Sequence, residues 1–558
     1  MLPYSQANRL MKATTPLGPD VLVLCGFRGR EALSELFHFQ LDLLAKRPFS
    51  APFDKMLGQP IGVHIELPNG LTRLFHGMVS RFTETQQDDT FTHYQAELVP
   101  KSWLMTRRLG SRTFQQKSVP EILQEVLRGF EFSLELTGDY PRRDYTVQYN
   151  ETDFAFASRL MEEEGIGYFF RHEEDRHEMV LFDNSLQLAD LPVDSTVVYE
   201  QVTDGVRDDV RVTSWSKSQQ TCSSEMTLWD HSFELPDQHL DATQAAPSTA
   251  KIGQAEHQLP GSDEKLEQYE YPGGYARWFD GVDPGGTARP DDPPKTFEQN
   301  ERIAGIRMQE QAAAAFDIEG ESNCLQFCPG FKFSLTRHFD ANDKYLLGSV
   351  EHDARLSAGF RSDDAVPELE YSNRFDCLPE SLPYRPRRHT PRPVIHGVQT
   401  ATVVGPEDSE LFVDKYGRVK VQFHWDREGK KDGNSSCWVR VSQVWAGPTW
   451  GAFFWPRVGH EVVVTFAEGD PDQPLIIGSV YNAQNMPPVE LPDDKMIGGI
   501  KSKVFEGDPA KNFNAVLFHD APGAEFVHVH SEKNELSNSE TNKLHCVNGA
   551  QVTFCGSI

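Results

Sequence analysis

The sequence has little cysteine, no long hydrophobic run and no visible export signal. Its eight cysteines are scattered over 558 residues, which favours reduced, partly buried thiols over a disulfide framework. No apolar stretch is long enough to cross a bilayer, and residues 1–15 lack the apolar core of a signal peptide. We therefore expect a protein that is made in the cytoplasm and, if it is exported, leaves without a cleaved signal.

Positive charge is also scarce. Lys and Arg together number 54 and Asp and Glu 83, so the formal net charge is −29 at pH 7. An acidic surface repels phosphate groups, which disfavours nucleic-acid binding, and solubility is the simplest interpretation of the charge. A chain of this length is too long for one hydrophobic core, so we expect roughly two to four domains.

Common catalytic motifs are missing as well. There is no Gly-x-Ser-x-Gly elbow, no Walker A loop and no His-Glu-x-x-His helix. His172 and His177 are five apart, which misses the zinc-helix spacing, so we interpret them as surface charge. The acids at 162–164 are of the type that glycosidases use in pairs, but the distance between their carboxylates cannot be read from the sequence. The sequence predicts no enzyme, no catalytic, cofactor-binding or metal residue, and no cofactor.

What the sequence does contain is alternation, clearest after Arg418. From Arg418 to Trp425 polar and apolar residues alternate: the even positions hold Arg, Lys, Gln and His, and the odd positions hold Val, Val, Phe and Trp. This alternation predicts a strand with one solvent-exposed face and one buried face. Asp414 to Gly417 predicts a tight turn before it. Further short apolar or alternating runs follow as far as Tyr481. About five short strands within residues 411–482 indicate a small closed barrel of the OB type.

The N-terminal third also indicates strands. Residues 21–25 form a continuous apolar run, residues 36–43 alternate, and residues 62–79 predict a hairpin with a turn at 68–70. Residues 91–99 add another strand. We expect a β-rich barrel or sandwich here and no parallel α/β domain.

Three helices are predicted among the strands. Ser118 is the expected N-cap of the first, with Gly129 as its stop. The second follows residues 150–153 and ends at Gly165. Acids in its last turn oppose the helix dipole, which would fit a contact surface or a solvated charged end, and we favour the solvated end. The third is expected at 300–316.

Two segments of irregular composition are also present. Residues 281–295 are crowded with Pro, Gly and Asp and predict an exposed, mobile loop. Residues 381–393 hold four prolines and four arginines without a hydrophobic period, which indicates a domain boundary.

Several of these stretches together resemble one known family. Residues 414–426, 438–441, 456–462 and 469–472 closely resemble the OB-fold domain of VgrG (valine-glycine repeat protein G), the spike protein of bacterial type VI secretion. Four further stretches resemble the hub of the same family: 147–166, 269–275, 327–335 and 345–352. The order and length of these matches make the resemblance specific, whereas an OB-like pattern alone would not be.

The resemblance implies a mainly β fold. It consists of two phage-tail-hub-like β-barrel domains with inserted helices at 1–380, a linker at 381–393 and an OB-fold domain at 394–485. A second linker at 486–511 and the start of a trimeric, intertwined β-helix needle at 512–558 follow. The chain ends at Ile558, barely into this needle, so we expect it to be a portion of a longer spike.

The resemblance also implies a mechanical function and a set of partners. Three copies would form a homotrimer on a hexameric Hcp tube, with a PAAR-repeat protein at the tip. An effector, for which the Rhs type is one candidate, would be carried with its adaptor or chaperone. Sheath contraction would drive this assembly through a target membrane, so the protein would be secreted through the type VI apparatus into a target cell or the medium. No nucleic acid is among the expected partners.

Three alternatives remain open at the level of sequence. One is an evolved spike with an enzymatic toxin domain beyond Ile558, and another is a contractile-phage tail hub. The third is an OB protein that binds carbohydrate or nucleic acid through exposed tryptophans. The roughly thirty residues between Asn482 and Asn512 are too few for an enzyme domain between barrel and needle.

A few side chains carry separate expectations. Trp425 shares the apolar parity and should pack in the barrel core, whereas Trp438 is expected at an inter-chain contact. His528 and His530 lie two apart on one strand face and would ring the axis of a trimer, where a structural role is favoured over a metal site.

Overall fold

One large sheet organises the N-terminal part of the chain. The computed structural model describes residues 4–66, 72–201, 210–259, 264–356 and 368–553. In these residues twelve strands hydrogen-bond in the order β1-β4-β5-β6-β3-β2-β21-β20-β12-β13-β19-β22, and β21 also pairs with β22. The first half is β1 (Met11–Thr14), β2 (Val23–Ala32), β3 (His38–Lys46), β4 (Pro60–Glu66), β5 (Thr72–Gln87) and β6 (Phe91–Val99). The second half is β12 (Thr196–Tyr199), β13 (Arg211–Gln219), β19 (Phe316–Ser322), β20 (Lys332–Thr336), β21 (Lys344–Leu356) and β22 (Leu369–Pro379).

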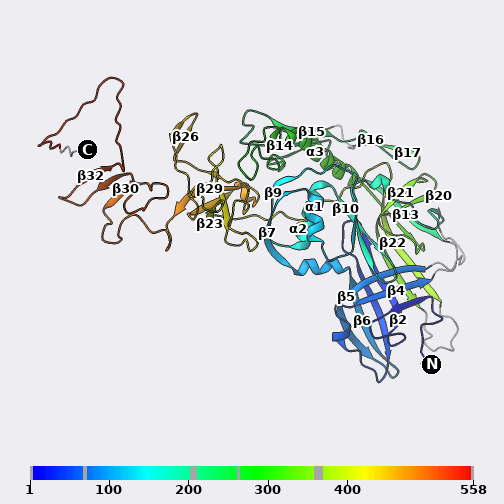
Figure 1. Ribbon diagram of the computed structural model, residues 1–558. Coiled ribbons are helices and arrows are strands. Elements are labelled where there is room, and N and C mark those ends of the chain that lie inside the picture. Colours follow the sequence, from blue (N-terminus) through cyan, green and yellow to red (C-terminus); the bar gives the residue numbers. More distant parts are fainter. Residues whose placement is uncertain (1–3, 67–71, 202–209, 260–263, 357–367, 554–558) are drawn as a thin grey trace.

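Each half of this sheet has its own hydrophobic core. The first packs around Phe27, Phe39 and Phe75, and the second around Phe327 and Phe375. The antiparallel pairing of β2 with β21 joins the two halves (Figure 1). The N-terminal part is therefore two packed β units built on one continuous sheet.

The strands predicted in this part are confirmed. The hairpin at 62–79 is β4 and β5, which pair in antiparallel register from Pro60↔Met78 to Glu66↔Thr72. Its predicted turn at 68–70 lies outside the described residues. The strand at 91–99 is β6, which pairs with both β3 and β5.

A smaller layer covers the first core. Its elements are β7 (Leu109–Lys117), α1 (Val119–Val126), β8 (Phe132–Glu135), β9 (Arg143–Thr152), α2 (Asp153–Glu164), β10 (Gly167–His172) and β11 (His177–Phe182). Ser118 caps α1 as predicted: its hydroxyl accepts from the Glu121 amide, and the Glu121 carboxylate accepts from the Ser118 amide. The helix ends at Val126, before Gly129. The second helix ends at Gly165, whose φ of +69° gives the left-handed cap that glycine favours.

The acids that end α2 are not solvated, so that prediction is wrong. Glu163 and Glu164 are buried. Arg143 ion-pairs with both, Arg392 lies 2.9 Å from Glu163, and Arg302 lies 2.5 Å from Glu164. Guanidinium groups from three separate segments, of which that of Arg143 is fully buried, offset the unfavourable helix-dipole position.

A third layer is built on the longest helix. It comprises β14 (Glu225–Asp230), β15 (Leu240–Ala245), β16 (Thr249–Ile252), β17 (Ala255–Gln258), β18 (Glu267–Glu270) and α3 (Thr296–Ala313). Its core includes Tyr275, Trp278 and Ile303. The third helix exists as predicted but lies a few residues earlier. The segment 281–295 was predicted to be exposed and mobile. Several of its residues, such as Asp291, are exposed, but Val282 and Pro293 are buried, because part of the segment packs against this layer and the next domain.

The OB-type barrel follows the hub. Its strands are β23 (Gln399–Val404), β24 (Lys420–Phe423), β25 (Arg440–Val441), β28 (Glu461–Phe466) and β29 (Pro474–Val480), in the order β24-β23-β28-β29-β25, with a separate hairpin of β26 (Trp445–Gly447) and β27 (Trp450–Ala452). Five strands are present as predicted, but the first, β23, precedes the predicted span of 411–482. Val419, Val421 and Phe423 form the core, and Trp425 packs against it as expected.

The C-terminal segment extends away from the barrel (Figure 1). It forms one antiparallel sheet of β30 (Ile497–Lys501), β31 (Ala515–His519) and β32 (Phe526–His530). None of the helices in the described ranges is long and apolar enough to cross a membrane. Seven cysteines lie in these ranges as free thiols, and Cys555 lies outside them.

Candidate assembly surfaces

The polar face of the first predicted barrel strand is covered by the hub. Arg418 was predicted to be wet but is 2% exposed. Its Nε donates to Asp414 (2.6 Å), and its two Nη atoms donate to the carboxylate of Asp280 in the hub (2.8 and 2.7 Å). Phe233 and Tyr416 lie beside the guanidinium, each with its ring centroid 5.2 Å away. The prediction fails because a distant hub segment lies over this face.

The next two polar positions are also buried. Lys420 is 1% exposed, with Nζ 5.0 Å from the ring centroid of Trp438, and burial lowers the pKa of this lysine to about 8. Gln422 is held by the backbone of its own domain, donating to the Asp426 carbonyl. His424 alone of the four is exposed, as predicted.

Trp438, which was expected at an inter-chain contact, contacts the hub of its own chain. Its indole N–H donates to the Asp283 carbonyl (2.7 Å), and its ring packs on Phe412 with a centroid distance of 4.7 Å. Asp283 belongs to the segment 281–295. That segment is therefore a docking loop for the barrel.

A second contact lies at the turn that follows β28. The Asp472 carboxylate accepts from the Val147 amide (2.7 Å) and lies 3.4 Å from Arg277, which also pairs with Asp470. Burial lowers the pKa of Arg277 to about 10. Together with Arg418–Asp280, these contacts join hub and barrel; we call the two sets the hub–barrel joint.

One carboxylate in this joint, that of Asp144, lies close to a second carboxylate, that of Asp280. Asp144 accepts from the backbone amide of Asp280 and from the side chain of Gln116. Burial, and next the nearby carboxylate of Asp280, raise the pKa of Asp144 to about 7. The joint therefore holds one acid that titrates near neutrality.

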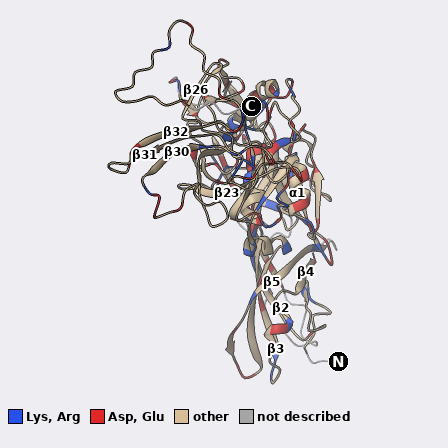
Figure 2. Cartoon of the chain, turned by 60° about the vertical axis from the view of Figure 1, so that its left-hand side comes forward, with Lys and Arg blue, Asp and Glu red and all other residues tan. Residues whose placement is uncertain are grey.

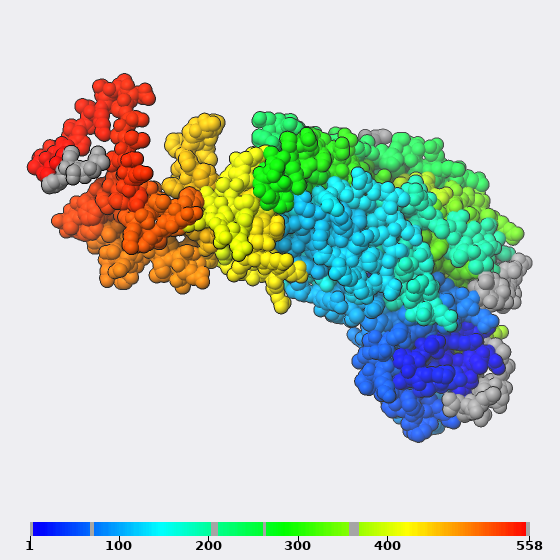
Figure 3. Space-filling view, viewed as in Figure 1, coloured from blue at the N-terminus to red at the C-terminus, as the bar shows by residue number. Residues whose placement is uncertain are grey.

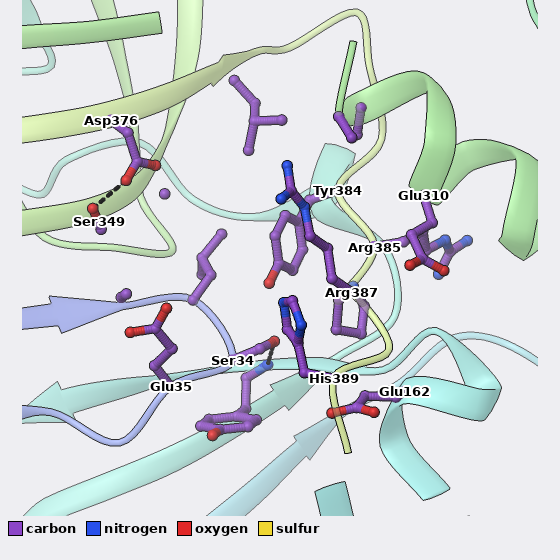
Figure 4. Close-up of a pocket in the computed structure, with 18 of the residues that line it drawn as sticks. Ser34, Glu35, Glu162, Glu310, Ser349, Asp376, Tyr384, Arg385, Arg387 and His389 are labelled. Atoms are coloured by element: carbon purple, nitrogen blue, oxygen red, sulfur yellow. Dashed lines mark hydrogen bonds between the residues drawn. The ribbon is translucent and has the colours of Figure 1, made fainter. Parts of the chain in front are cut away.

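The predicted linker at 381–393 is attached to the hub. Arg385 donates to the carbonyls of Gly165 (3.0 Å) and Asp183 (2.6 Å), and Thr390 donates twice to Glu162. The segment passes over a cavity of about 700 Å³, which is lined by Glu35 and Asp376 from the two β units of the hub and by Arg385 and Arg387 from the segment itself (Figure 4). We call residues 384–390 the strap. Because it is fastened to the hub near both of its ends, the barrel is not tethered by a loose linker.

The C-terminal sheet is clamped to the barrel through one acid. The Glu410 carboxylate lies 3.2 Å from Arg457 and 2.8 Å from Lys503, and it accepts from the Glu506 amide. Arg457 also donates to the Lys503 carbonyl (2.7 Å). Charged side chains thus hold the start of this segment in place.

One face of the C-terminal sheet is apolar and uncovered. The register places Ile500, Val516 and Val529 in one row and Phe518 and Val527 in the next. These five side chains are between 41% and 64% exposed. We call them the apolar needle face. Nothing in the described part of the chain packs against it, and a surface of this kind marks an interaction site.

The barrel adds further exposed apolar side chains. The hairpin β26–β27 stands out from the body of the molecule (Figures 1 and 3). Exposed residues on and beside it are Val444 (94%), Trp445 (64%), Trp450 (52%), Phe453 (63%) and Phe454 (61%). Charged residues of both signs, in contrast, are interspersed along the described hub (Figure 2).

The histidines singled out in the sequence fall into two groups. His528 and His530 share one face of β32, with ring centroids 6.0 Å apart, and His530 packs on Phe513. No group of three or more metal-ligating side chains occurs within the described residues. His172 and His177 are buried, so their interpretation as surface charge is wrong; they lie under the aromatic core of the first β unit.

Two β units on a shared sheet, an OB barrel docked on them and an apolar sheet beyond define a tail-hub and spike protein. Residues 30–358 match the family described as phage tail baseplate hub (GPD). Residues 399–481 match the type VI secretion system/phage-baseplate injector OB domain.

Relatives specify the family. The chain is 38% identical over 535 residues to the type VI secretion system spike protein VgrG1a of Pseudomonas aeruginosa, covering 95% of this chain and 78% of that protein. The chain therefore belongs to the VgrG family of type VI secretion spike proteins. A further relative, at 32% identity over 530 residues, is the actin cross-linking toxin VgrG1 of Vibrio cholerae, with 93% of this chain and 45% of that protein covered.

A solved structure supports the fold. The Escherichia coli c3393 protein, described as a type VI secretion component similar to the phage T4 tail proteins gp27 and gp5, superposes with a TM-score of 0.53. Identity is 21%, and the match covers 84% of this chain and 99% of that one. The identity to the VgrG spike proteins makes the chain a spike component of a type VI secretion system, which decides against the isolated OB-binding alternative.

Proposed function

We propose that this chain acts as a homotrimer that forms the hub and the needle base of the spike. The observation that carries the proposal is the apolar needle face. A three-stranded sheet with five exposed apolar side chains on one face has no core of its own, and three copies that wrap together would bury that face. Obligate interfaces of this kind bury several thousand Å² (~2,000–5,000 Å²), which makes dissociation on dilution unfavourable.

Absolute mass in solution tests the proposal. Light scattering behind a sizing column should give about three times the chain mass of 63.1 kDa, and the value should hold on dilution. A folded particle of one chain mass at all concentrations would contradict it.

We infer that the hub stands on a hexameric Hcp tube. Each chain contributes two β units with separate cores, so three chains offer six units to a sixfold ring. Co-sedimentation with purified Hcp tubes is the test. Binding should require the trimer, and a trimer that fails to bind Hcp would overturn this part while leaving the trimer itself intact.

The remaining parts of the proposal follow the family. We divide the chain into the hub (1–380), a linker (381–393), the OB domain (394–485), a second linker (486–511) and the needle start (512–558). The first linker is supported by the two family matches, which leave residues 359–398 between them uncovered. A PAAR-repeat protein would cap the needle, and an effector with its adaptor would travel with it. The chain's own work is mechanical: sheath contraction pushes the spike through the target membrane, and the protein is secreted through the apparatus.

A second candidate is a spike that also bears a toxin. The relative named an actin cross-linking toxin favours it, because this chain covers 45% of that protein. The reading frame downstream of residue 558 tests it directly. A further folded domain with an activity of its own would make the protein an enzyme-bearing spike, and a frame that ends in needle repeats would exclude this.

A further inference from the structure

Four histidines form a buried network in the hub that the proposed function does not use. The side chains of His172 and His352 are inaccessible, and His76 and His177 are 7% and 8% exposed. They come from β5, β10, β11 and β21. The network therefore lies where the first β unit, the β10–β11 hairpin and the second β unit meet.

The hydrogen bonds fix the protonation of the first pair. His177 Nε2 faces the backbone N–H of Lys101 at 2.8 Å, and an N–H can only donate, so Nε2 accepts. The proton of His177 then sits on Nδ1, which donates to Nδ1 of His76 at 2.9 Å. His76 accordingly carries its own proton on Nε2. Both rings are neutral in this arrangement.

His172 links this pair to Glu31. Its Nδ1 lies 3.1 Å from the backbone nitrogen of His76 and 3.2 Å from the carbonyl oxygen of the same residue, so either tautomer finds a partner there. Its Nε2 faces the carboxylate of Glu31 at 3.5 Å. Glu31 is the point at which the two arms of the network join.

The second arm runs through His352. Its Nε2 donates to Glu31 at 3.1 Å, and its Nδ1 accepts from the hydroxyl of Tyr371 at 2.7 Å. The Tyr371 oxygen accepts in turn from Asn373. Burial alone would raise the pKa of Glu31. Arg73, 2.7 Å away, and the two histidines instead hold that pKa well below its usual range. One carboxylate and one guanidinium thus balance each other among four neutral rings.

An added proton on the first pair of histidines has no acceptor. The bare ring nitrogen of His177 faces the N–H of Lys101, and that of His76 faces the N–H of His177. A second proton would turn two donors toward each other in a buried site. The other charged groups near the rings are Lys101, Asp175 and Arg73. Burial, chiefly, lowers the pKa of His76 and His352, and lowers that of His177 to about 3.

We propose that this four-histidine network is an acid-sensitive latch, which holds the β10–β11 hairpin against the first β unit at neutral pH and releases it in acid. The sign follows from linkage. His76, His177 and His352 have folded-state pKa values below that of the unfolded chain, near 6.5, so their stabilising contribution is full above that value and is lost as pH falls below it. Glu31 adds a further loss below its unfolded-state pKa of about 4.5.

Hydrogen exchange read by mass spectrometry tests the latch in the full chain. Peptides from β5, β10 and β11 should be protected at pH 7.5 and exchange much faster at pH 5.5, after correction for the intrinsic pH dependence. Peptides from β28 and β29 in the barrel should keep their protection. Retained protection of β10–β11 at pH 5.5 would overturn the proposal.

A matched variant separates the latch from general acid sensitivity. His172→Gln with His177→Gln keeps one acceptor and one donor at each position but does not titrate. The opening midpoint should move down by about one pH unit or more. His239→Gln, at an exposed histidine, is the control and should change nothing. An unchanged midpoint in the double variant would contradict the proposal.

A measurement on the unaltered protein covers the case in which the variant does not fold. Exchange of the imidazole C2 proton, followed by mass spectrometry, reports the pKa of each histidine. His76 and His177 should titrate well below the exposed His239, and their C2 protons should exchange slowly. Titration of the buried pair near 6.5 would overturn the latch.

Discussion

Arg418 of the barrel and Asp280 of the hub form a bidentate ion pair, with both Nη atoms within 2.8 Å of the carboxylate oxygens. The pair joins residues 138 positions apart in the sequence. Because Arg418 also holds Asp414 and is almost fully buried, it cannot reorient without leaving two carboxylates unpaired. The orientation of the barrel on the hub is therefore set by side-chain chemistry.

Removing this guanidinium should loosen the joint. Arg418→Met leaves the two buried carboxylates without a cation, and breaking a buried pair in this way costs about 3–5 kcal/mol. We expect a lower free energy of unfolding in guanidinium chloride and faster proteolysis between hub and barrel. Arg427→Met, at an exposed position of the same domain, is the control. A loss below about 1 kcal/mol would mean that the pair does not hold the joint.

Asp144 should give the joint an opposite pH dependence to that of the histidine latch. Its folded-state pKa of about 7 lies above the unfolded value of 3.8, so the stability that it contributes is present at low pH and is lost as pH rises to 7. Asp144→Asn should therefore stabilise the protein by an amount that grows from pH 4 to pH 7, by at most about 1.4 kcal/mol per unit, and then levels off. Thermal unfolding across this range measures it. Asp291→Asn, at an exposed acid, should give a flat profile, and an equally flat profile for Asp144→Asn would contradict the assignment.

The apolar needle face should be sensitive to charge. Val527→Asp combined with Val529→Asp places two carboxylates on the surface that we expect three chains to bury. Light scattering should show a shift from trimer toward monomer, while the far-ultraviolet circular dichroism of the hub is unchanged. Lys533→Gln, in the same segment but outside this face, should remain trimeric. A trimer that survives the double substitution would place the interface elsewhere.

The buried acid at the end of α2 should matter for hub stability. Burial alone would raise the pKa of Glu163, but Arg392 and Arg143 hold it well below its usual range. The contribution of Glu163 to the stability of the folded hub is therefore full above about pH 4.5 and is lost below that pH. Glu163→Gln should cost about 3 kcal/mol at pH 7 and much less at pH 3. Denaturation at the two pH values measures this. Glu174→Gln, at an exposed acid, is the control, and an equal cost for Glu163→Gln at both values would rule out a charge effect.

Local patterns in the sequence predicted local structure well. The capping of α1 by Ser118, the hairpin of β4 and β5 and the buried parity of Val419, Val421 and Phe423 each depend on neighbours within a few residues, and each is confirmed. Resemblance to the family then supplied the order of the domains, which no local pattern contains.

Burial of polar side chains was not predictable in the same way. Alternation assigns Arg418 and Lys420 to one face of a strand, but whether that face meets water depends on the loop at 281–295, more than a hundred residues earlier. Glu163 likewise finds its cations in β9 and at Arg392, two residues after the strap. The burial of His172 and His177 could not be predicted, because the alternation of residues along a strand does not show which other segment of the chain covers a side chain. Strand β23, in contrast, could have been predicted from the sequence, because polar and apolar residues alternate from Thr400 to Val403.

The strap has a consequence for how force would pass through the molecule. Residues 384–390 lie fastened to the hub, so the covalent path between hub and barrel carries little of any axial thrust. That thrust would pass instead across the side chains that face each other in the joint, among them Arg277 with Asp472 and Trp438 with the loop at 281–295. Exchange of a barrel and needle between relatives would therefore succeed only where both sides of this joint are inherited together.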